Sequence, residues 1–350
     1  MERLCDVRWV YAVDRIYPSS EFDSRDWLLL SSQLMPCLLA WGNNLAGNLD
    51  PASGEPIISS PRRVLEDLGI EEIVWSSWAS TIGRGMSLPG FSGCEIDLWS
   101  VGDEYYTWGS AIPGELGQAP AKLSLASRPV KILGADEATV YLDQDGHVRK
   151  LPDDGAKSST SWEDVVLLDS GAVYAISADT KSTAQVSHFK TFDDFMIYAD
   201  STTITHPLLN TVSSLHATES RVFALSSGPL VHLLEIDSKG SVKLVEDLEG
   251  LGVESIVPGS ANRIAVVTEA GDAYLIHNRS LEPELLEVED ESAVRFVGVG
   301  SKHEIVVTED NVWVRGESKS LILCVLTPRQ VLSAGYGNRS SRRLCKVTLL

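Results

Sequence analysis

The sequence predicts an all-β protein built from repeated small sheets, and three observations point to that fold class. A stretch that begins at Val212 recurs at Val253 and Val294, at intervals of 41 residues (253 − 212 and 294 − 253). A Trp-Gly unit occurs at Trp41 and again at Trp108, and in both copies a Gly and a Leu follow at the same spacing. Apolar residues spaced for an amphipathic helix are almost absent. A period of about 40 residues with several short strands per repeat is typical of a β-propeller blade.

A ring of blades explains why such small sheets recur. One small sheet cannot cover both of its faces, whereas radial stacking buries the faces between neighbours and leaves only short edges exposed. A closed ring also needs its last blade to be completed by a strand from the opposite terminus. Residues 1–37 mix aromatic and β-branched residues without helical spacing, so we expect them to supply an opening strand. The sequence therefore predicts one propeller domain over residues 1–350, closed by N- and C-terminal strands.

The first half of the chain carries the two Trp-Gly units and one clear hairpin. After the first unit we expect a Pro- and Ser-containing loop at residues 51–61, a turn or two of helix at 62–68 and a strand within 70–81. An aromatic-rich strand ends in Trp108-Gly109, and alternating apolar residues at 130–151 flank Asp145-Gly146. Because Asp-Gly supplies the positive φ angles of a tight turn, this last stretch predicts an antiparallel hairpin.

The second half carries the regular repeat. Residues 164–176 and 186–204 are rich in β-formers but irregular, and the three copies of the 41-residue repeat follow them. Gly259 and Gly300 share one offset within that repeat, and hairpin turns are expected at Ala270-Gly271 and Asp310-Asn311. A last partial copy begins at Val331. Each copy is predicted to form one blade.

The net charge restricts the kind of partner. The 350 residues include 49 Asp and Glu against 29 Lys and Arg, which gives a formal charge of −20 and a sequence pI of about 4.7. Such a surface repels phosphate backbones, so direct binding of nucleic acid is not expected. We expect a protein partner with a basic surface instead.

Cysteine usage and the first residues indicate the compartment. The five cysteines are odd in number, widely spaced and without a Cys-x-x-Cys pair, which predicts reduced thiols: Cys5, Cys37, Cys94, Cys324 and Cys345. Charged residues near Met1 interrupt any signal-peptide pattern, and the most apolar window, residues 27–41, is too short to cross a bilayer. We therefore expect a cytoplasmic protein without a membrane partner, with the nucleus as a second compartment.

The repeats resemble those of the regulator of chromosome condensation family of seven-bladed β-propellers. Residues 41–49 and 108–117 match the second half of the family's repeat, with its Trp-Gly strand and Gly-x-Leu loop. The first half is matched by Gly298, Gly300, His303, Asp310 and Trp313. The family's buried His position is otherwise occupied by Ala79, Thr139, Arg221, Asn262 and Ser340. The resemblance implies seven blades.

Within that family, a lone propeller of this size with few Trp-Gly units is similar to the fungal alpha-tubulin suppressor type. This resemblance implies an adaptor that binds a small zinc-containing electron carrier serving tRNA wobble-uridine modification and diphthamide synthesis. The founding family member instead exchanges nucleotide on the GTPase Ran while bound to chromatin. Guanine-nucleotide exchange on a small Ras-type GTPase is therefore the main alternative function, and a chromatin- or oxygenase-associated adaptor is a third.

No set of residues predicts a reaction. His303-Glu304 begins the HExxH pattern of zinc proteases, but Val307 stands where the second His is required. Asp143 and Asp145 resemble part of a calcium loop, but Tyr141 occupies the first ligand position and the closing Glu is missing, so a hairpin turn explains them. We therefore predict a non-enzymatic protein with no catalytic residue, no metal-binding residue and no cofactor.

The predicted partner-binding residues lie on loops that join strands along one rim of the propeller. Exposed aromatic side chains at such positions make a binding surface, and carboxylates there attract Lys or Arg. The predicted residues are Trp75, Trp78, Asp136, Glu137, Asp193, Asp194, Lys302 and Tyr336, with Ser301 and Asn338 beside them. Simple packing of the two tryptophans and an ordinary acidic surface are the alternatives. The protein is expected to be a monomer or to form a heterodimer with its partner.

Overall fold

The structure is a computed structural model. It describes residues 38–43, 50, 57–65, 68, 70–77, 80–86, 103–109, 120–134, 138–152, 155–177, 185–227, 230–277, 280–288, 292–300, 303–308, 311–316 and 345–347. The chain divides into two compact units, a smaller one that contains Val7–Ser124 and a larger one that contains Leu125–Lys319. We describe each unit by itself. The single-domain organisation remains a prediction.

The smaller unit contains a four-stranded antiparallel sheet in chain order: β3 (Ile70–Ser76), β4 (Ser80–Met86), β5 (Asp103–Gly109) and β6 (Ala121–Leu123). The predicted aromatic strand that ends in Trp108-Gly109 is confirmed as β5. Trp108 is buried against Gly83, where an added Cβ would lie only 2.9 Å from the indole ring. A glycine is therefore required for the indole to pack on β4.

The smaller unit also contains a two-stranded antiparallel sheet of β1 (Leu38–Asn43) and β2 (Ile57–Val64). The expected loop at 51–61 and the expected helical turn at 62–68 are therefore wrong where β2 runs through them. Arg63 pairs with Leu39 and Ile57 pairs with Asn43 across the ladder. Pro61 is tolerated because both strands of a two-stranded sheet are edges, where a missing N–H costs little.

The larger unit contains five sheets, counted over the residues that the structure describes, and we name each by its first strand. The β7 sheet comprises β7 (Pro129–Leu133), β8 (Val140–Asp143) and β9 (Val148–Lys150). The β10 sheet comprises β10 (Trp162–Leu167), β11 (Val173–Ser177), β12 (Val186–Phe189) and β13 (Thr202–Ile204). The β14 sheet comprises β14 (Val212–Ala217), β15 (Val222–Ser226), β16 (Leu233–Ile236) and β17 (Val242–Leu244).

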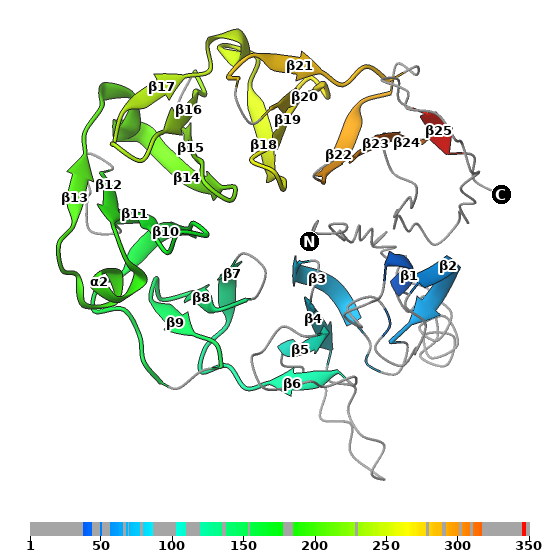
Figure 1. Cartoon of the computed structure of the whole chain (residues 1–350), viewed down its shortest axis with the longest axis horizontal. Coiled ribbons are helices and arrows are strands. Elements are labelled where there is room, and N and C mark those ends of the chain that lie inside the picture. The colour runs from blue at the N-terminus through cyan, green and yellow to red at the C-terminus, as the bar shows by residue number, and fades with distance from the viewer. Residues whose placement is uncertain are drawn as a thin grey trace, which may run out of the picture. The chain divides into compact units, whose positions relative to one another are not determined.

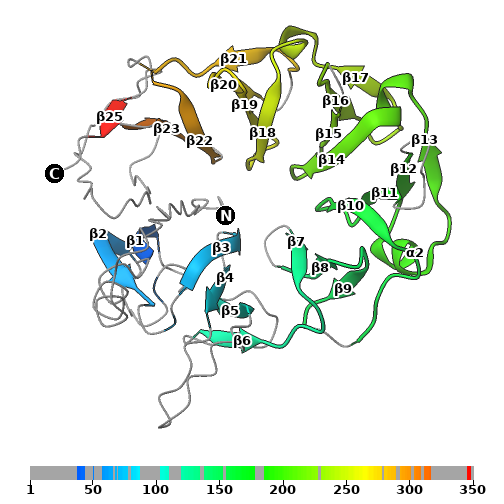
Figure 2. The same cartoon turned by 180° about the vertical axis from the view of Figure 1, so that it is seen from behind.

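The remaining two sheets have the same order. The β18 sheet comprises β18 (Val253–Pro258), β19 (Ile264–Thr268), β20 (Ala273–Ile276) and β21 (Pro283–Leu285). The β22 sheet comprises β22 (Val294–Val299), β23 (His303–Thr308), β24 (Val312–Gly316) and β25 (Cys345–Val347). Two short 3-10 helices, η2 (Pro207–Thr211) and η3 (Glu246–Leu248), precede β14 and β18. Within the larger unit the first strand of each sheet lies innermost and the last lies outermost (Figure 1; Figure 2).

The predicted 41-residue repeat is confirmed, because β14, β18 and β22 begin at Val212, Val253 and Val294. In each of these first strands the register shifts between the first and third residues, so the second residue forms a bulge. The predicted hairpin at Asp145-Gly146 is also confirmed, since β8 and β9 pair antiparallel across it and Gly146 has a φ of 79°.

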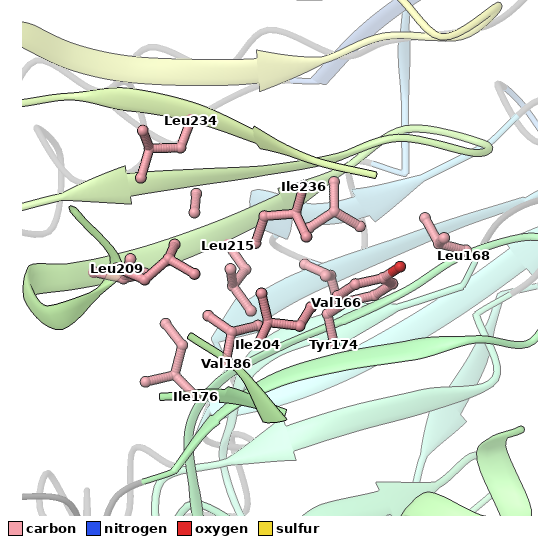
Figure 3. Close-up of a cluster of buried hydrophobic side chains, with 13 residues drawn as sticks. Val166, Leu168, Tyr174, Ile176, Val186, Ile204, Leu209, Leu215, Leu234 and Ile236 are labelled. Atoms are coloured by element: carbon pink, nitrogen blue, oxygen red, sulfur yellow. The ribbon is translucent and has the colours of Figure 1, made fainter. Parts of the chain in front are cut away.

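Alternating side chains pack consecutive sheets of the larger unit against one another. Val173 and Ala175 of β11 face the β7 sheet, whereas Tyr174 and Ile176 of the same strand face the β14 sheet. Figure 3 shows the second of these contacts, in which residues of β10, β11 and β12 meet residues of β14 and β16. Similar apolar clusters join the β14 sheet to the β18 sheet and the β18 sheet to the β22 sheet. The period of two along each strand therefore builds the core.

One element departs from the predicted all-β pattern of residues 186–204. The short helix α2 (Phe192–Ile197) lies between β12 and β13. Thr191 caps it, because the Thr191 Oγ1 accepts from the backbone N–H of Asp194 at 3.1 Å and donates to the Asp194 carboxylate at 2.6 Å. This reciprocal cap is a local signal for a helix start that outweighs the β-forming composition.

The blade count of seven and closure by the two termini remain predictions. Residues 1–37 and the partial copy at Val331 lie outside the described residues. Within the described residues, the C-terminal strand β25 pairs with β24 as the outermost strand of the β22 sheet.

Candidate functional site

The connections between the first and second strands of adjacent sheets are joined into a row by hydrogen bonds. The Asp169 backbone N–H donates to the Glu219 carbonyl at 3.2 Å, which joins the β10 and β14 sheets. The Ala261 backbone N–H donates to the Glu219 Oε1 at 2.9 Å, which joins the β14 and β18 sheets. We call this row the inter-sheet rim and define it as residues 168–172, 218–221 and 259–263, together with Gly300.

Asn262 holds the middle of the inter-sheet rim. Its Oδ1 accepts hydrogen bonds from the Ser220 N–H at 2.8 Å, from the Ser220 hydroxyl at 2.9 Å and from the Thr218 hydroxyl at 2.9 Å. The backbone of Ala261 and Asn262 is left-handed, with φ of 56° and 57°. Asn adopts this conformation at lower cost than most residues. One side chain thus fixes two neighbouring loops.

Arg221 forms a second link between the β14 and β18 sheets. Its Nη1 donates to the His277 carbonyl at 2.8 Å and to the Asn262 carbonyl at 3.3 Å, and its Nε donates to the Glu235 Oε1 at 2.6 Å. The guanidinium lies 4.8 Å from the centre of the Phe223 ring, in cation–π contact. Arg221 occupies the position at which the resemblance implies a buried His that bonds the next blade, and the arginine makes that inter-sheet bond here.

Arg263 links the β18 sheet to the β22 sheet. Its Nη1 donates to the Gly300 carbonyl at 2.7 Å, and its guanidinium forms an ion pair with Glu304. Arg315 pairs with the other oxygen of that carboxylate at 2.9 Å. Burial, together with the nearby charge of Arg315, lowers the pKa of Arg263 to about 10, so the guanidinium remains charged at neutral pH. A buried pair of this kind fixes loop positions because breaking it leaves an uncompensated charge.

The innermost strands of the larger unit carry a further polar contact. The Lys131 Nζ donates to the Asp164 Oδ1 and to the Leu215 carbonyl, both at 2.8 Å, while the Leu215 N–H donates to the Asp164 Oδ2 at 2.6 Å. These bonds join the first strands of three consecutive sheets. Beside them, burial and the charge of Lys131 lower the pKa of His216 to about 4, so this imidazole is neutral at pH 7.

The structure places three of the predicted binding residues. Asp193 and Asp194 lie in the first turn of α2; Asp193 is exposed, whereas Asp194 is half-buried and takes part in the helix cap. Trp75 lies in strand β3, paired with Ile82 and half-buried, and not in the following loop as expected. The other predicted residues lie outside the described residues: Trp78, Asp136, Glu137, Ser301, Lys302, Tyr336 and Asn338.

Sequence reasoning missed the residues that hold the inter-sheet rim together, namely Glu219, Arg221, Asn262 and Arg263. A signal for two of them was present, since Arg221, Asn262 and His303 follow one another at intervals of 41 residues (262 − 221 and 303 − 262). Nothing in the spacing indicates that Arg263, one residue after that position, reaches the next sheet.

No group of three or more His, Cys, Asp or Glu side chains in the described part of the chain is arranged to hold a metal ion. In the same part, no helix has the length and apolar character needed to cross a membrane.

Comparison with known proteins supports the fold. No protein-family model matches the chain, and no curated protein matches it in sequence. Human WBSCR16 is similar in structure with a TM-score of 0.51 and 14% identity, over 80% of this chain and 88% of WBSCR16. Prp20p from Saccharomyces cerevisiae, the yeast RCC1, is similar with a TM-score of 0.52 and 12% identity, over 86% of this chain and 85% of Prp20p.

These likenesses define the class of fold. The sheets form an all-β propeller, and it is a propeller like those of Prp20p and WBSCR16. The solved structures of Prp20p concern its binding to Gsp1p and histones and its complex with Kap60.

Proposed function

We propose that the protein is a non-enzymatic propeller adaptor that binds a protein partner through the inter-sheet rim and the loops at the same end of the sheets. The observation that carries this proposal is the row of hydrogen bonds through Glu219, Asn262 and Arg263. Loops held in fixed positions lose little conformational entropy when a partner binds, and this lowers the cost of association.

The chemistry of this end favours a partner with a basic surface. In an antiparallel sheet whose strands follow chain order, the first and third connections lie at the same end. The helix α2 therefore lies at the rim end of the β10 sheet, together with the exposed Asp169 and Asp193. By their place in the chain, Asp136, Glu137 and Lys302 belong to first connections of sheets in the larger unit, and we include them, with Asp194 and Tyr336, in the proposed binding surface. We propose Trp75 and Trp78 of the smaller unit as partner-binding residues in their own right.

The finer assignment is to the fungal alpha-tubulin suppressor type. We propose a seven-bladed ring closed by N- and C-terminal strands that acts in the cytoplasm, and also in the nucleus, as monomer or heterodimer. Its partner is then the small zinc electron carrier of tRNA wobble-uridine modification and diphthamide synthesis. The solved structures of Prp20p concern its binding to Gsp1p and histones and its complex with Kap60. They support a protein-binding role for this fold.

Guanine-nucleotide exchange is the second candidate function. It is favoured by the similarity to Prp20p, which extends over 85% of a protein that binds Gsp1p. In this alternative the same rigid end would stabilise the nucleotide-free state of a small Ras-type GTPase. Chromatin- or oxygenase-associated adaptors of the same fold are a third candidate.

Affinity purification of the tagged full-length protein from cells tests the adaptor proposal. We expect the zinc carrier to be recovered, and we expect Asp193→Lys to weaken its capture about fivefold, as for the loss and reversal of one surface charge. Glu254→Lys is the matched control, because Glu254 is an exposed carboxylate at the opposite end of its sheet. Equal capture by both variants and the wild type would remove Asp193 from the interface.

An exchange assay separates the second candidate. The purified protein is mixed with Ras-type GTPases that carry a fluorescent nucleotide. The adaptor proposal predicts an unchanged rate of nucleotide release, whereas accelerated release of one GTPase's nucleotide would favour the exchange factor.

A further inference from the structure

Two adjacent apolar side chains are exposed to solvent at the C-terminal end of α2: the last helical residue, Ile197, and the C-cap residue, Tyr198. Ile197 is 71% exposed, the most of any large hydrophobic side chain in the described residues, and Tyr198 is 50% exposed. Single exposed apolar residues are common on protein surfaces and need no explanation. Two in succession at the end of an ordered helix need one.

The exposure of these side chains does not come from a loose helix end. The Tyr198 N–H donates to the Phe195 carbonyl at 3.1 Å, and the Ala199 N–H donates to the Asp194 carbonyl at 2.8 Å. This pair of bonds closes the helix with a left-handed residue, as in a Schellman motif. The apolar side chains are therefore held at a fixed position.

A buried aromatic cluster supports α2 from below. The Trp162 ring lies 5.2 Å from the Phe195 ring and 5.8 Å from the Phe189 ring, and the Tyr198 ring lies 5.8 Å from both Trp162 and Phe189. Trp162 is 2% exposed, and its Nε1 has no hydrogen-bond partner among the described residues. Tyr198 is thus the half-exposed outer member of a cluster that contains an unpaired indole N–H.

The backbone at this position is strained. Tyr198 has a φ of 56° and Asp200 has a φ of 47°, although Gly would adopt such angles without steric cost. Strained residues that persist in a folded protein cluster at binding sites and switch regions. Here the left-handed residue is Tyr198, a large aromatic residue at a position where the backbone conformation favours Gly.

Carboxylates flank the exposed pair. Asp193 precedes Ile197 by four residues, so both lie on one face of α2, and Asp193 is exposed. Asp200 is also exposed and follows Tyr198 by two residues. Residues 190–200 contain three acidic residues, Asp193, Asp194 and Asp200, and one basic residue, Lys190.

We infer that Ile197 and Tyr198, with Asp193 and Asp200, form a docking surface for a peptide segment in which an aliphatic side chain is flanked by Lys or Arg. We call these four residues the α2 surface. The aliphatic side chain packs on Ile197 and the Tyr198 ring, and the basic side chains pair with the two carboxylates. Aromatic and aliphatic anchors ringed by polar groups are typical of the residues that contribute most to binding. The inference rests on the proposed function, which it deepens by naming the partner's chemistry.

The test measures binding of a fluorescein-labelled amphipathic Lys/Leu peptide to the full-length protein by fluorescence anisotropy. Wild-type protein is expected to bind it, and Ile197→Ser/Tyr198→Asn is expected to raise the Kd about tenfold, as for the loss of one anchor pair. Asn is chosen because it tolerates the left-handed conformation. Ile197→Ser alone, at a site that contributes little to the core, keeps the test valid if the double variant is unstable.

The matched control is Leu230→Ser/Leu251→Ser. Leu230 and Leu251 are 54% and 40% exposed and lie at the opposite end of their sheets, and Leu251 follows Glu249 by two residues. The inference requires that this variant binds the peptide like the wild type and that a Glu/Leu peptide does not bind.

Three results would overturn the inference: no binding of the Lys/Leu peptide, equal weakening by the control variant, or a concentration-dependent dimer in sedimentation that the Ile197→Ser variant abolishes. In the last case a second copy of this chain is the occupant. If the peptide fails while Asp193→Lys still weakens capture of a cellular partner, the proposed function stands and only the docking of a basic-aliphatic peptide on Ile197 and Tyr198 is lost.

Discussion

The two ends of the sheets in the larger unit are joined in different ways. At the rim end, side chains of Arg221, Asn262 and Arg263 cross from one sheet to the next, beside one backbone bond from Asp169 to Glu219. At the opposite end, which we call the turn end, backbone groups make the crossings. The Trp162 N–H donates to the Gly146 carbonyl at 2.7 Å, and the Val294 N–H donates to the Gly271 carbonyl at 2.8 Å.

The turn end is therefore joined by backbone groups, whereas the rim end is joined mainly by side chains. In the β7 and β18 sheets the turn between the second and third strands holds a glycine with positive φ, 79° for Gly146 and 84° for Gly271. The rim end depends on long polar side chains at particular positions, so its surface can change between propellers while the sheets stay in place.

Removal of Arg263 should give the largest effect at the rim end. Arg263→Met leaves the buried Glu304 with only Arg315 as a partner. Because an incompletely paired buried charge is costly, we expect a loss of about 3–5 kcal/mol in the free energy of unfolding, measured with urea. A loss below about 1 kcal/mol would mean that the rim-end pairs contribute no more than surface ion pairs do.

A methyl group added at Gly271 should weaken the contact between sheets at the turn end. In Gly271→Ala the new Cβ would lie 2.5 Å from the Ala293 Cβ, in addition to the cost of a φ of 84°. We expect a loss of about 2–3 kcal/mol in the free energy of unfolding. Gly155→Ala is the control, since Gly155 has a φ of 81° but nothing lies within 4 Å of its added Cβ, and we expect about 1 kcal/mol there. Equal losses would show that the close approach to Ala293 has no role.

Acid should weaken the strand that leads into the rim end. The pKa of His216 is lowered by burial, and then by Lys131, from 6.5 to about 4. Between these values the unfolded chain binds a proton that the folded protein does not, so stability falls as the pH falls. One such proton contributes about 1.4 kcal/mol per pH unit at most.

Comparison with His216→Gln isolates this effect. From pH 7 to pH 5 we expect the wild type to lose about 1–2 kcal/mol more than the variant in urea unfolding. Parallel losses in the two proteins would place the acid sensitivity elsewhere in the chain.

The smallest expected effect concerns Asn262. Asn262→Gly keeps the left-handed backbone but removes the oxygen that accepts from Ser220 and Thr218. We expect a loss of only about 1 kcal/mol in the free energy of unfolding, because the exposed Ser220 can bond to water instead and the Thr218 hydroxyl also donates to the Arg221 carbonyl. If the inter-sheet rim is a binding surface, the fold reduction in partner capture should exceed what a loss of about 1 kcal/mol in the free energy of unfolding explains. A variant with normal capture would separate loop order from binding.

The turn end and the packing of the sheets could be predicted from the sequence. Alternating apolar residues, the Asp145-Gly146 and Ala270-Gly271 turns and the 41-residue repeat are local patterns, and local patterns determine strands and hairpins. The helix α2 was missed because its cap at Thr191 lies within a stretch of β-forming residues. The two-stranded sheet of β1 and β2 was missed because Pro61 indicated a loop.

The rim end could not be predicted in the same way. The bond from Arg221 to the His277 carbonyl spans 56 residues, and the pair of Arg263 with Glu304 spans 41 (304 − 263). The sequence gives the positions of these charges but not which of them meet, since that depends on the placement of one sheet against the next. Asp193 was predicted from its expected place on a rim loop, and its neighbours Ile197 and Tyr198 were not predicted at all.

Amide hydrogen exchange measures whether separate sheets share one rigid row of loops. We expect slow exchange at the Ser220 and Ala261 amides in the wild type, because each donates to a side chain of the adjacent sheet. We also expect Asn262→Gly to release the Ser220 amide while the amides of β15 and β19 stay protected. If both rim amides of the wild type exchange at the rate of an unstructured peptide, the loops do not form a rigid row.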